Sequence, residues 1–338
     1  MTRSKIFWLP VAGLLWLTRL HDCVQAAESS PALAAYEQLI TELEARQQTV
    51  SVDAELAEAY FGLGNSLQTL ERHEAAGAAF DKALQALREN KGLYELEQLP
   101  VLQAQLDSSL ALASWQAVDA GRQLAYLITL KNPAASTEMR YQTLRELGLW
   151  KLLAAEDDLL PNSLGAVKEA AALYQHELER PGVRAFYQGR GLSLANLYLD
   201  MAALEFLQAR EKMALPLSAY VVGGQRTVTE TQCQTLQTPD GRGRQVCRSI
   251  QVPNLDYFMS MSDRKYKETR RHLDAMKAAV LEAHAVLLGE VETRNRADAL
   301  SLLSDVHRLT AAFNDFVAEN SRRTGSRIAP TTGSILRR

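Results

Sequence analysis

The 338-residue chain has few of the residues that build a catalytic centre or a β-sandwich core. Aromatic residues make up only 7% of it and alanine is abundant, which favours closely packed helices over a pair of packed sheets. It has no phosphate-binding glycine loop, no dinucleotide-binding glycine motif and no nucleophile elbow. No two histidines stand three or four residues apart, so a metal site on one helical face is not expected. Glu268 and His272 are one turn apart and are expected to pair on a helix surface. We therefore predict a protein that is not an enzyme and has no cofactor.

An excess of positive charge is also absent. The chain holds 37 basic and 40 acidic residues, which gives a net charge of −3. Proteins that bind nucleic acid usually carry a basic patch or an overall basic balance. Nucleic acid is therefore not an expected partner.

The apolar run near the N-terminus is short for a membrane span. It extends from Ile6 to Leu17, follows Arg3 and Lys5, and precedes a Val24-Gln25-Ala26 cleavage pattern. This arrangement is typical of a secretory signal peptide. We expect residues 1–26 to be removed and the mature protein to reside in the periplasm, without an integral membrane span. An uncleaved anchor is the alternative.

The strongest pattern in the chain lies at residues 57–84. In its first half apolar residues recur at steps of three and four, the polar segment Glu71–Glu74 follows, and a second apolar stripe runs to Leu84. Two such stripes separated by a short polar segment predict two antiparallel helices. Gly64 and Ala76 are small residues within them, which indicates that the helices approach closely.

This helix pair resembles the tetratricopeptide repeat. The resemblance rests on an aromatic, a Leu-Gly pair and an aliphatic residue in the first helix, and on an Ala, an aromatic and an Ala in the second. These residues are Tyr60, Leu63, Gly64, Leu67, Ala76, Phe80 and Ala83. Arg88 stands where the family has a closing proline, which indicates a longer second helix. An ordinary alanine-rich helical hairpin is the alternative.

Weaker apolar stripes at 101–130 and 139–173 extend the pattern. We therefore expect an all-α fold in which residues 27–216 form an α-solenoid of antiparallel helix pairs like those of the tetratricopeptide family. Such a solenoid leaves a concave face free for an extended ligand. Its last helix, at 192–213, is apolar almost all round and is expected to be buried.

The character of the sequence changes between residues 217 and 252. This segment is rich in Thr, Val and Gln around a turn-forming stretch at Pro239–Gly243, which predicts a β-hairpin. Cys233 and Cys247 are equally distant from Asp240, so they are expected to face each other and form a disulfide. We interpret the hairpin as a structural or partner-contacting flap. Two cysteines alone do not complete a zinc site.

Two long helices are expected in a C-terminal helical hairpin at 253–320, at residues 263–292 and 296–319. Their apolar residues step by three and four, which is the pattern of a helix-pair seam. The pair is expected to cover the end of the solenoid, and a homodimer through this seam is the alternative. The remaining residues, 321–338, are basic and contain no acid, which predicts a disordered tail.

The resemblance also implies where a ligand binds. In repeats of this family the ligand contacts first-helix residues that alternate with the packing set, here Glu58, Phe61, Asn65, Gln68 and Thr69. We therefore expect a non-catalytic scaffold of the cell envelope that binds a protein or peptide partner on its concave face. The alternatives are a structural component that self-associates through the C-terminal helices, and an enzyme with an unpatterned site. For Phe61, packing within the core is the alternative role.

The first testable prediction concerns export. Protein purified from its native host is expected to begin near Ala27, because the segment before it has the organisation of a signal peptide. Intact-mass measurement checks this directly. A mass that includes Met1 would contradict both the cleavage and the assignment to the periplasm.

Overall fold

A computed structural model describes residues 31–47, 53–187, 190–221, 223–237, 243–291 and 296–324. The expected signal peptide, its cleavage site, the centre of the hairpin turn and residues 325–338 lie outside this part of the chain. The chain divides into two compact units, residues 1–112 and 113–338. This division falls inside the segment 27–216 that the sequence suggested as one repeat domain, and each unit is described by itself below.

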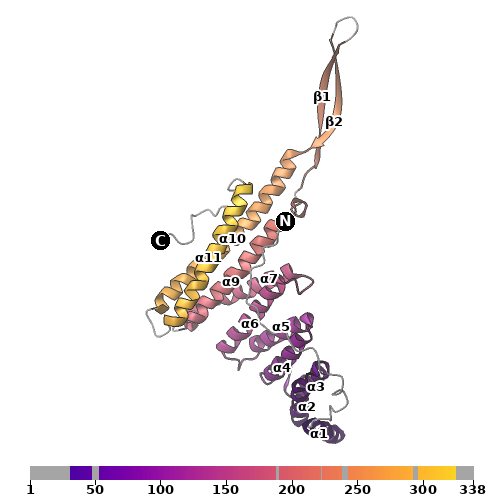
Figure 1. The fold of residues 1–338 in the computed structure, drawn as a ribbon, viewed down its shortest axis with the longest axis vertical. Helices are drawn as coiled ribbons and strands as arrows, with labels where there is room; N and C mark the ends of the chain where they lie inside the picture. The colour runs from indigo at the N-terminus through magenta and orange to yellow at the C-terminus, as the bar shows by residue number, and fades with distance from the viewer. Residues whose placement is uncertain are drawn as a thin grey trace, which may run out of the picture. The chain divides into compact units, whose positions relative to one another are not determined.

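The described part of the first unit holds four helices, and successive helices pack on one another. They are α1 (Pro31–Gln47), α2 (Asp53–Thr69), α3 (His73–Lys91) and α4 (Gln98–Ala111) (Figure 1). The predicted antiparallel pair is formed by α2 and α3, which a three-residue turn connects. Its apolar set is in the core as expected: six of the seven residues that carry the resemblance are buried, and Leu63 is half-buried.

Two glycines of α2 let its neighbours approach closely. A Cβ atom added at Gly64 would overlap the Phe80 ring of α3, and Phe80 is fully buried. A Cβ atom added at Gly62 would overlap the Tyr36 ring of α1. Residues two apart on a helix point to nearly opposite sides, so the two glycines admit α1 and α3 on different sides of α2.

The second unit combines helices with one β-ribbon. Its described elements are α5 (Trp115–Lys131), α6 (Thr137–Glu156), α7 (Ser163–Glu179), α8 (Val183–Phe186), α9 (Gly191–Ala214), the 3-10 turn η1 (Leu217–Ala219), β1 (Thr227–Gln237), β2 (Gly243–Pro253), α10 (Leu255–Val291) and α11 (Arg296–Thr324). One apolar core joins α6, α7 and α9, and another joins α9, α10 and α11. Figure 1 shows α9, α10 and α11 side by side. The all-α fold with a small β-hairpin is therefore confirmed.

The packing of a ring on a glycine recurs in the second unit. A Cβ atom added at Gly148 of α6 would overlap the Tyr174 ring of α7, and Tyr174 is fully buried. Gly148 and Tyr174 are further apart in the sequence than Gly64 and Phe80, because the connection from α6 to α7 is longer than that from α2 to α3 and each residue lies further from it. That difference in spacing hid the correspondence in the sequence.

Three helices also end alike. Two residues beyond the ends of α2, α4 and α6, a residue other than glycine adopts a left-handed conformation: Glu71 (φ 59°), Ala113 (φ 51°) and Asp158 (φ 54°). After α2 and α6 the next amide donates to a carbonyl five residues earlier, with 2.9 Å between Arg72 N and Leu67 O and 2.8 Å between Leu159 N and Ala154 O. This is the Schellman C-cap. The left-handed residue that follows each of them relates α2, α4 and α6 to one another, and α2 and α6 also share the Schellman hydrogen bond.

The C-terminal helices differ from their predicted limits. The helix expected from residue 263 begins at Leu255, directly after β2, because Asn254 caps it. Asn254 Oδ1 accepts hydrogen bonds from the amides of Asp256 (3.1 Å) and Tyr257 (3.3 Å). α11 continues to Thr324, so the prediction of a disordered tail from residue 321 was wrong for residues 321–324.

The apolar seam of α10 is occupied within the chain. Its residues are fully buried against α9 and α11: Leu273, Met276, Val280, Ala283 and Leu287. α9 thus converts the expected helix pair into a three-helix bundle. Self-association would need a surface other than this seam.

A pair of alanine substitutions tests the packing at Gly64. Gly64→Ala is expected to lower the free energy of unfolding by about 1–3 kcal/mol, because the added methyl group forces the buried Phe80 ring to move. Gly77→Ala in α3 is the matched control, since a Cβ atom there meets nothing within 4 Å. The control is expected to raise stability by about 1 kcal/mol through helix propensity. Equal effects in chemical denaturation would contradict the packing.

Candidate binding surfaces

The five expected binding residues all lie on α2, but their surroundings differ. Glu58, Asn65 and Thr69 are exposed, whereas Phe61 and Gln68 are half-buried. The Phe61 ring lies 6.0 Å from the Phe80 ring, centroid to centroid. Phe61 therefore packs on α3 with one side and is open to solvent only in part.

Gln68 makes a contact between helices. Its side-chain amide donates a hydrogen bond of 3.1 Å to the Ala104 carbonyl of α4. This hydrogen bond to the backbone of α4 fixes the Gln68 side chain. We therefore assign Gln68 to the positioning of α4 and not to direct contact with a ligand. Its contact also places the exposed faces of α2 and α4 next to each other.

α4 presents the same positions to solvent as α2. The left-handed residues Glu71 after α2 and Ala113 after α4 align the two helices. In this alignment the α4 counterparts of the five α2 residues are all exposed: Pro100, Gln103, Asp107, Leu110 and Ala111. We call the exposed residues of the two helices the α2–α4 surface: Glu58, Asn65, Thr69, Pro100, Gln103, Asp107 and Leu110. The sequence concealed the α4 half because Leu106 stands where α2 has Gly64.

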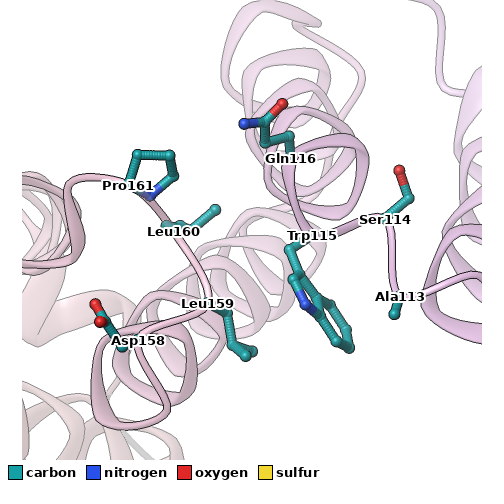
Figure 2. Close-up of a pocket in the computed structure, with 8 residues that line it drawn as sticks. All are labelled: Ala113, Ser114, Trp115, Gln116, Asp158, Leu159, Leu160 and Pro161. Atoms are coloured by element: carbon teal, nitrogen blue, oxygen red, sulfur yellow. The ribbon is translucent and has the colours of Figure 1, made fainter.

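A hollow of about 570 Å³ lies between the start of α5 and the connection from α6 to α7. Figure 2 shows its eight lining residues, with Trp115 and Gln116 from α5 and Leu160 and Pro161 from the connection. A second hollow of about 390 Å³ shares three of these residues and continues along α5. Together they form a groove with a mixed polar and apolar lining.

The strongest charges in this groove neutralise each other. Lys151 of α6 is 3% exposed, and its Nζ lies 2.6 Å and 2.9 Å from the two carboxylate oxygens of Asp119. Trp150 Nε1 donates to the same carboxylate at 3.0 Å. Because a buried ion pair must be complete to be tolerated, we assign Asp119 and Lys151 to the joining of α5 and α6.

A third hollow, of about 490 Å³, lies among α7, α9 and α10 and contains His272. His272 Nδ1 is 2.6 Å from Glu205 Oε2 of α9. The expected pairing of His272 with Glu268 is therefore wrong. Glu268 instead accepts hydrogen bonds from Lys212 and Arg264, and the bond from Lys212 is the main cause of its lowered pKa. The pairs of Glu205 with His272 and of Lys212 with Glu268 join α9 to α10, whereas Arg264 and Glu268 both lie on α10.

A buried polar cluster links α6, α7 and α9. Arg145 donates to Asp200 at 2.9 Å and to Asn196 at 3.2 Å, and the Tyr174 hydroxyl donates to Asp200 at 3.2 Å. Burial raises the pKa of Asp200, although the Arg145 guanidinium acts in the opposite direction. Arg145 precedes Gly148 by the same distance as Phe61 precedes Gly64, so this position contacts a neighbouring helix in both units.

The ribbon of β1 and β2 has two different faces. Antiparallel pairing places Cys233 opposite Cys247, and the predicted disulfide between them is confirmed. The face that holds the disulfide carries Thr, Gln and Ser side chains. Opposed residues share a face, so the register gathers all the aliphatic and charged side chains of the strands on the other face: Val228, Glu230, Leu236, Arg244, Val246, Arg248, Ile250 and Val252.

The described residues lack two further kinds of feature. Within these ranges, no group of three or more His, Cys, Asp or Glu side chains is arranged to hold a metal ion. No helix among the described segments has both the length and the apolar composition needed to cross a bilayer.

Comparison with models of protein families, with curated proteins and with solved structures finds no match for this chain.

Substitutions on α2 distinguish packing from contact residues. Phe61→Ala is expected to lower the free energy of unfolding by about 2 kcal/mol, because roughly half of a core phenylalanine's contribution is at stake. Asn65→Ala on the exposed side is the control and should change it by less than about 0.5 kcal/mol. Denaturant titration measures both. A Phe61→Ala value as small as that of the control would show that the ring does not support α3.

Proposed function

We propose that the protein is an exported, non-catalytic scaffold of the cell envelope that binds a protein or peptide partner on the α2–α4 surface. The observation that carries this proposal is the side-by-side exposure of corresponding residues on two adjacent helices. The hydrogen bond from Gln68 to Ala104 holds those helices together. Corresponding faces of successive first helices bind ligands in the tetratricopeptide repeats that this chain resembles.

The chemistry of the surface favours an extended peptide. Asn65 and Gln103 carry amide groups, which pair with peptide N–H and C=O groups. Leu110 is 40% exposed and offers an apolar contact. Glu58 and Asp107 add negative charge, which favours basic side chains in the partner. We therefore expect a partner segment that is neutral to basic and contains at least one aliphatic residue.

Export is supported by two features of the chain. The first is the organisation of residues 1–26. The second is the Cys233–Cys247 disulfide on the exposed ribbon, since disulfides persist in oxidising compartments such as the periplasm. Both fit a protein that works in the cell envelope.

A triple substitution tests the binding surface. Replacing Asn65, Gln103 and Asp107 with alanine is expected to reduce retention of the partner from envelope extract at least tenfold, because contact energy is concentrated in few residues. Thermal stability should stay the same, since all three side chains are exposed.

The matched control replaces Gln85 and Glu89 of α3 with alanine. These side chains are exposed and bond to each other, so the control removes polar groups from another face of the same unit. It should retain the partner at the wild-type level. Equal retention by the triple variant and the wild type would place the binding site elsewhere.

A further inference from the structure

The β-ribbon lacks the support that a two-stranded sheet normally needs. Each strand is 11 residues long, and within the described segments the strands contact each other and no other element. Every side chain described in them is exposed or half-buried. An isolated two-stranded hairpin is only marginally stable in water, and three or more strands are usually required.

The two outer edges of the ribbon are protected differently. β2 carries Arg244, Arg248 and Pro253, which are residues that discourage pairing with a further strand. β1 contains Glu230 as its one charged residue and has no proline. The open edge is therefore that of β1.

The disulfide shows which backbone groups this edge offers. The Cα atoms of Cys233 and Cys247 are 3.9 Å apart, which matches the closer of the two kinds of antiparallel pair, the one without mutual hydrogen bonds. In such pairs the backbone N–H and C=O point away from the partner strand. Because the two kinds alternate, Thr229, Thr231, Cys233 and Thr235 all direct these groups to the outer edge of β1.

The sequence of β1 complements itself. It reads TVTETQCQTLQ, and an antiparallel copy centred on Gln232 places Val228 opposite Leu236, Thr229 opposite Thr235 and Glu230 opposite Gln234. No like charges meet. The register also places Thr231 of one copy opposite Cys233 of the other. The backbone N–H and C=O groups that point outward from β1 in one copy therefore face those of the other copy and can form hydrogen bonds along the whole edge.

We propose that β1 pairs with β1 of a second copy of this chain, antiparallel and about a two-fold axis at Gln232, to form a four-stranded sheet. The sheet supplies the missing strands and extends the aliphatic face of each ribbon across the axis. The two Arg248 residues lie on the outer strands and are kept apart. The alternative dimer, in which the aliphatic faces of two ribbons stack on each other, is disfavoured. In it Arg248, which lies opposite the central Gln232, would contact Arg248 of the other copy. This dimer is independent of the α2–α4 surface.

Proline substitutions distinguish the two edges. In Thr231→Pro the lost N–H points to the outer edge, so the β1–β2 ladder keeps its hydrogen bonds. Two intermolecular hydrogen bonds are lost per dimer, and the dimer Kd should rise about tenfold or more. Ser249→Pro is the matched control, because Ser249 is the partner of Thr231 and its N–H points to the β2 edge.

Sedimentation velocity over a concentration series measures both variants against the oxidised wild type. The wild type is expected to dimerise, the Ser249→Pro variant to keep the wild-type Kd, and the Thr231→Pro variant to dissociate. A monomeric wild type overturns the proposal, and so do equal Kd values for the two variants. A thiol assay verifies that the Cys233–Cys247 disulfide has formed in each.

A cysteine substitution tests the register without relying on proline. In the proposed dimer Gln232 faces its own copy as a pair without mutual hydrogen bonds, at about 4.5 Å between Cα atoms, which a disulfide can bridge. Gln232→Cys should therefore yield a covalent dimer on a non-reducing gel. Gln234→Cys is the control and should stay monomeric there, because it faces Glu230. Equal cross-linking of the two variants, or none in either, would overturn the register.

Discussion

The contact of an aromatic ring with a glycine governs how this chain folds. Phe80 rests on Gly64 in the first unit and Tyr174 rests on Gly148 in the second. A glycine within a helix costs about 1 kcal/mol in propensity, yet it removes the Cβ atom that would hold the facing helix away. Each ring is fully buried, and a fully buried large side chain contributes several kcal/mol. The packing gain therefore exceeds the local cost, and it fixes the separation of each helix pair.

α9 has the corresponding role in the second unit. This helix contributes apolar side chains to two cores, one shared with α6 and α7 and one shared with α10 and α11. No apolar face of α9 is therefore left exposed to solvent. Its two sides are reinforced by polar pairs, Asp200 with Arg145 and Glu205 with His272. Each pair joins α9 to another helix, so an arrangement of the bundle that separated the two helices would leave a buried polar group without its partner.

The sequence predicted those features that depend on local periodicity. The helices, the burial of α9, the β-hairpin and the Cys233–Cys247 pair all follow from residue spacing within one element. The features that it missed depend on residues distant in sequence. Tyr174 was overlooked because its spacing from Gly148 differs from that of Phe80 from Gly64. The early start of α10 depends on one capping side chain, Asn254, whose hydrogen bonds to the amides of Asp256 and Tyr257 leave no periodic signal in the sequence.

The candidate binding residues show the same limit. Glu58, Asn65 and Thr69 lie on the exposed side of α2 as the repeat pattern suggested. Phe61 and Gln68 were assigned to the same face from their positions alone, but the Phe80 ring and the Ala104 carbonyl engage them. Periodicity assigns a residue to a side of its helix, whereas the neighbouring helices determine how much of that side remains open.

The ribbon has the topology of an insertion between α9 and α10. The chain enters and leaves it at adjacent points, since the Asn254 amide donates to the Arg226 carbonyl at 2.9 Å and the Asn254 side chain donates to Gln225. α9 and α10, between which the ribbon is inserted, pack on each other independently of the strands. The length and sequence of the ribbon are therefore free to diverge during evolution without disturbing the bundle, and a change of partner at this place would leave the fold of the unit intact.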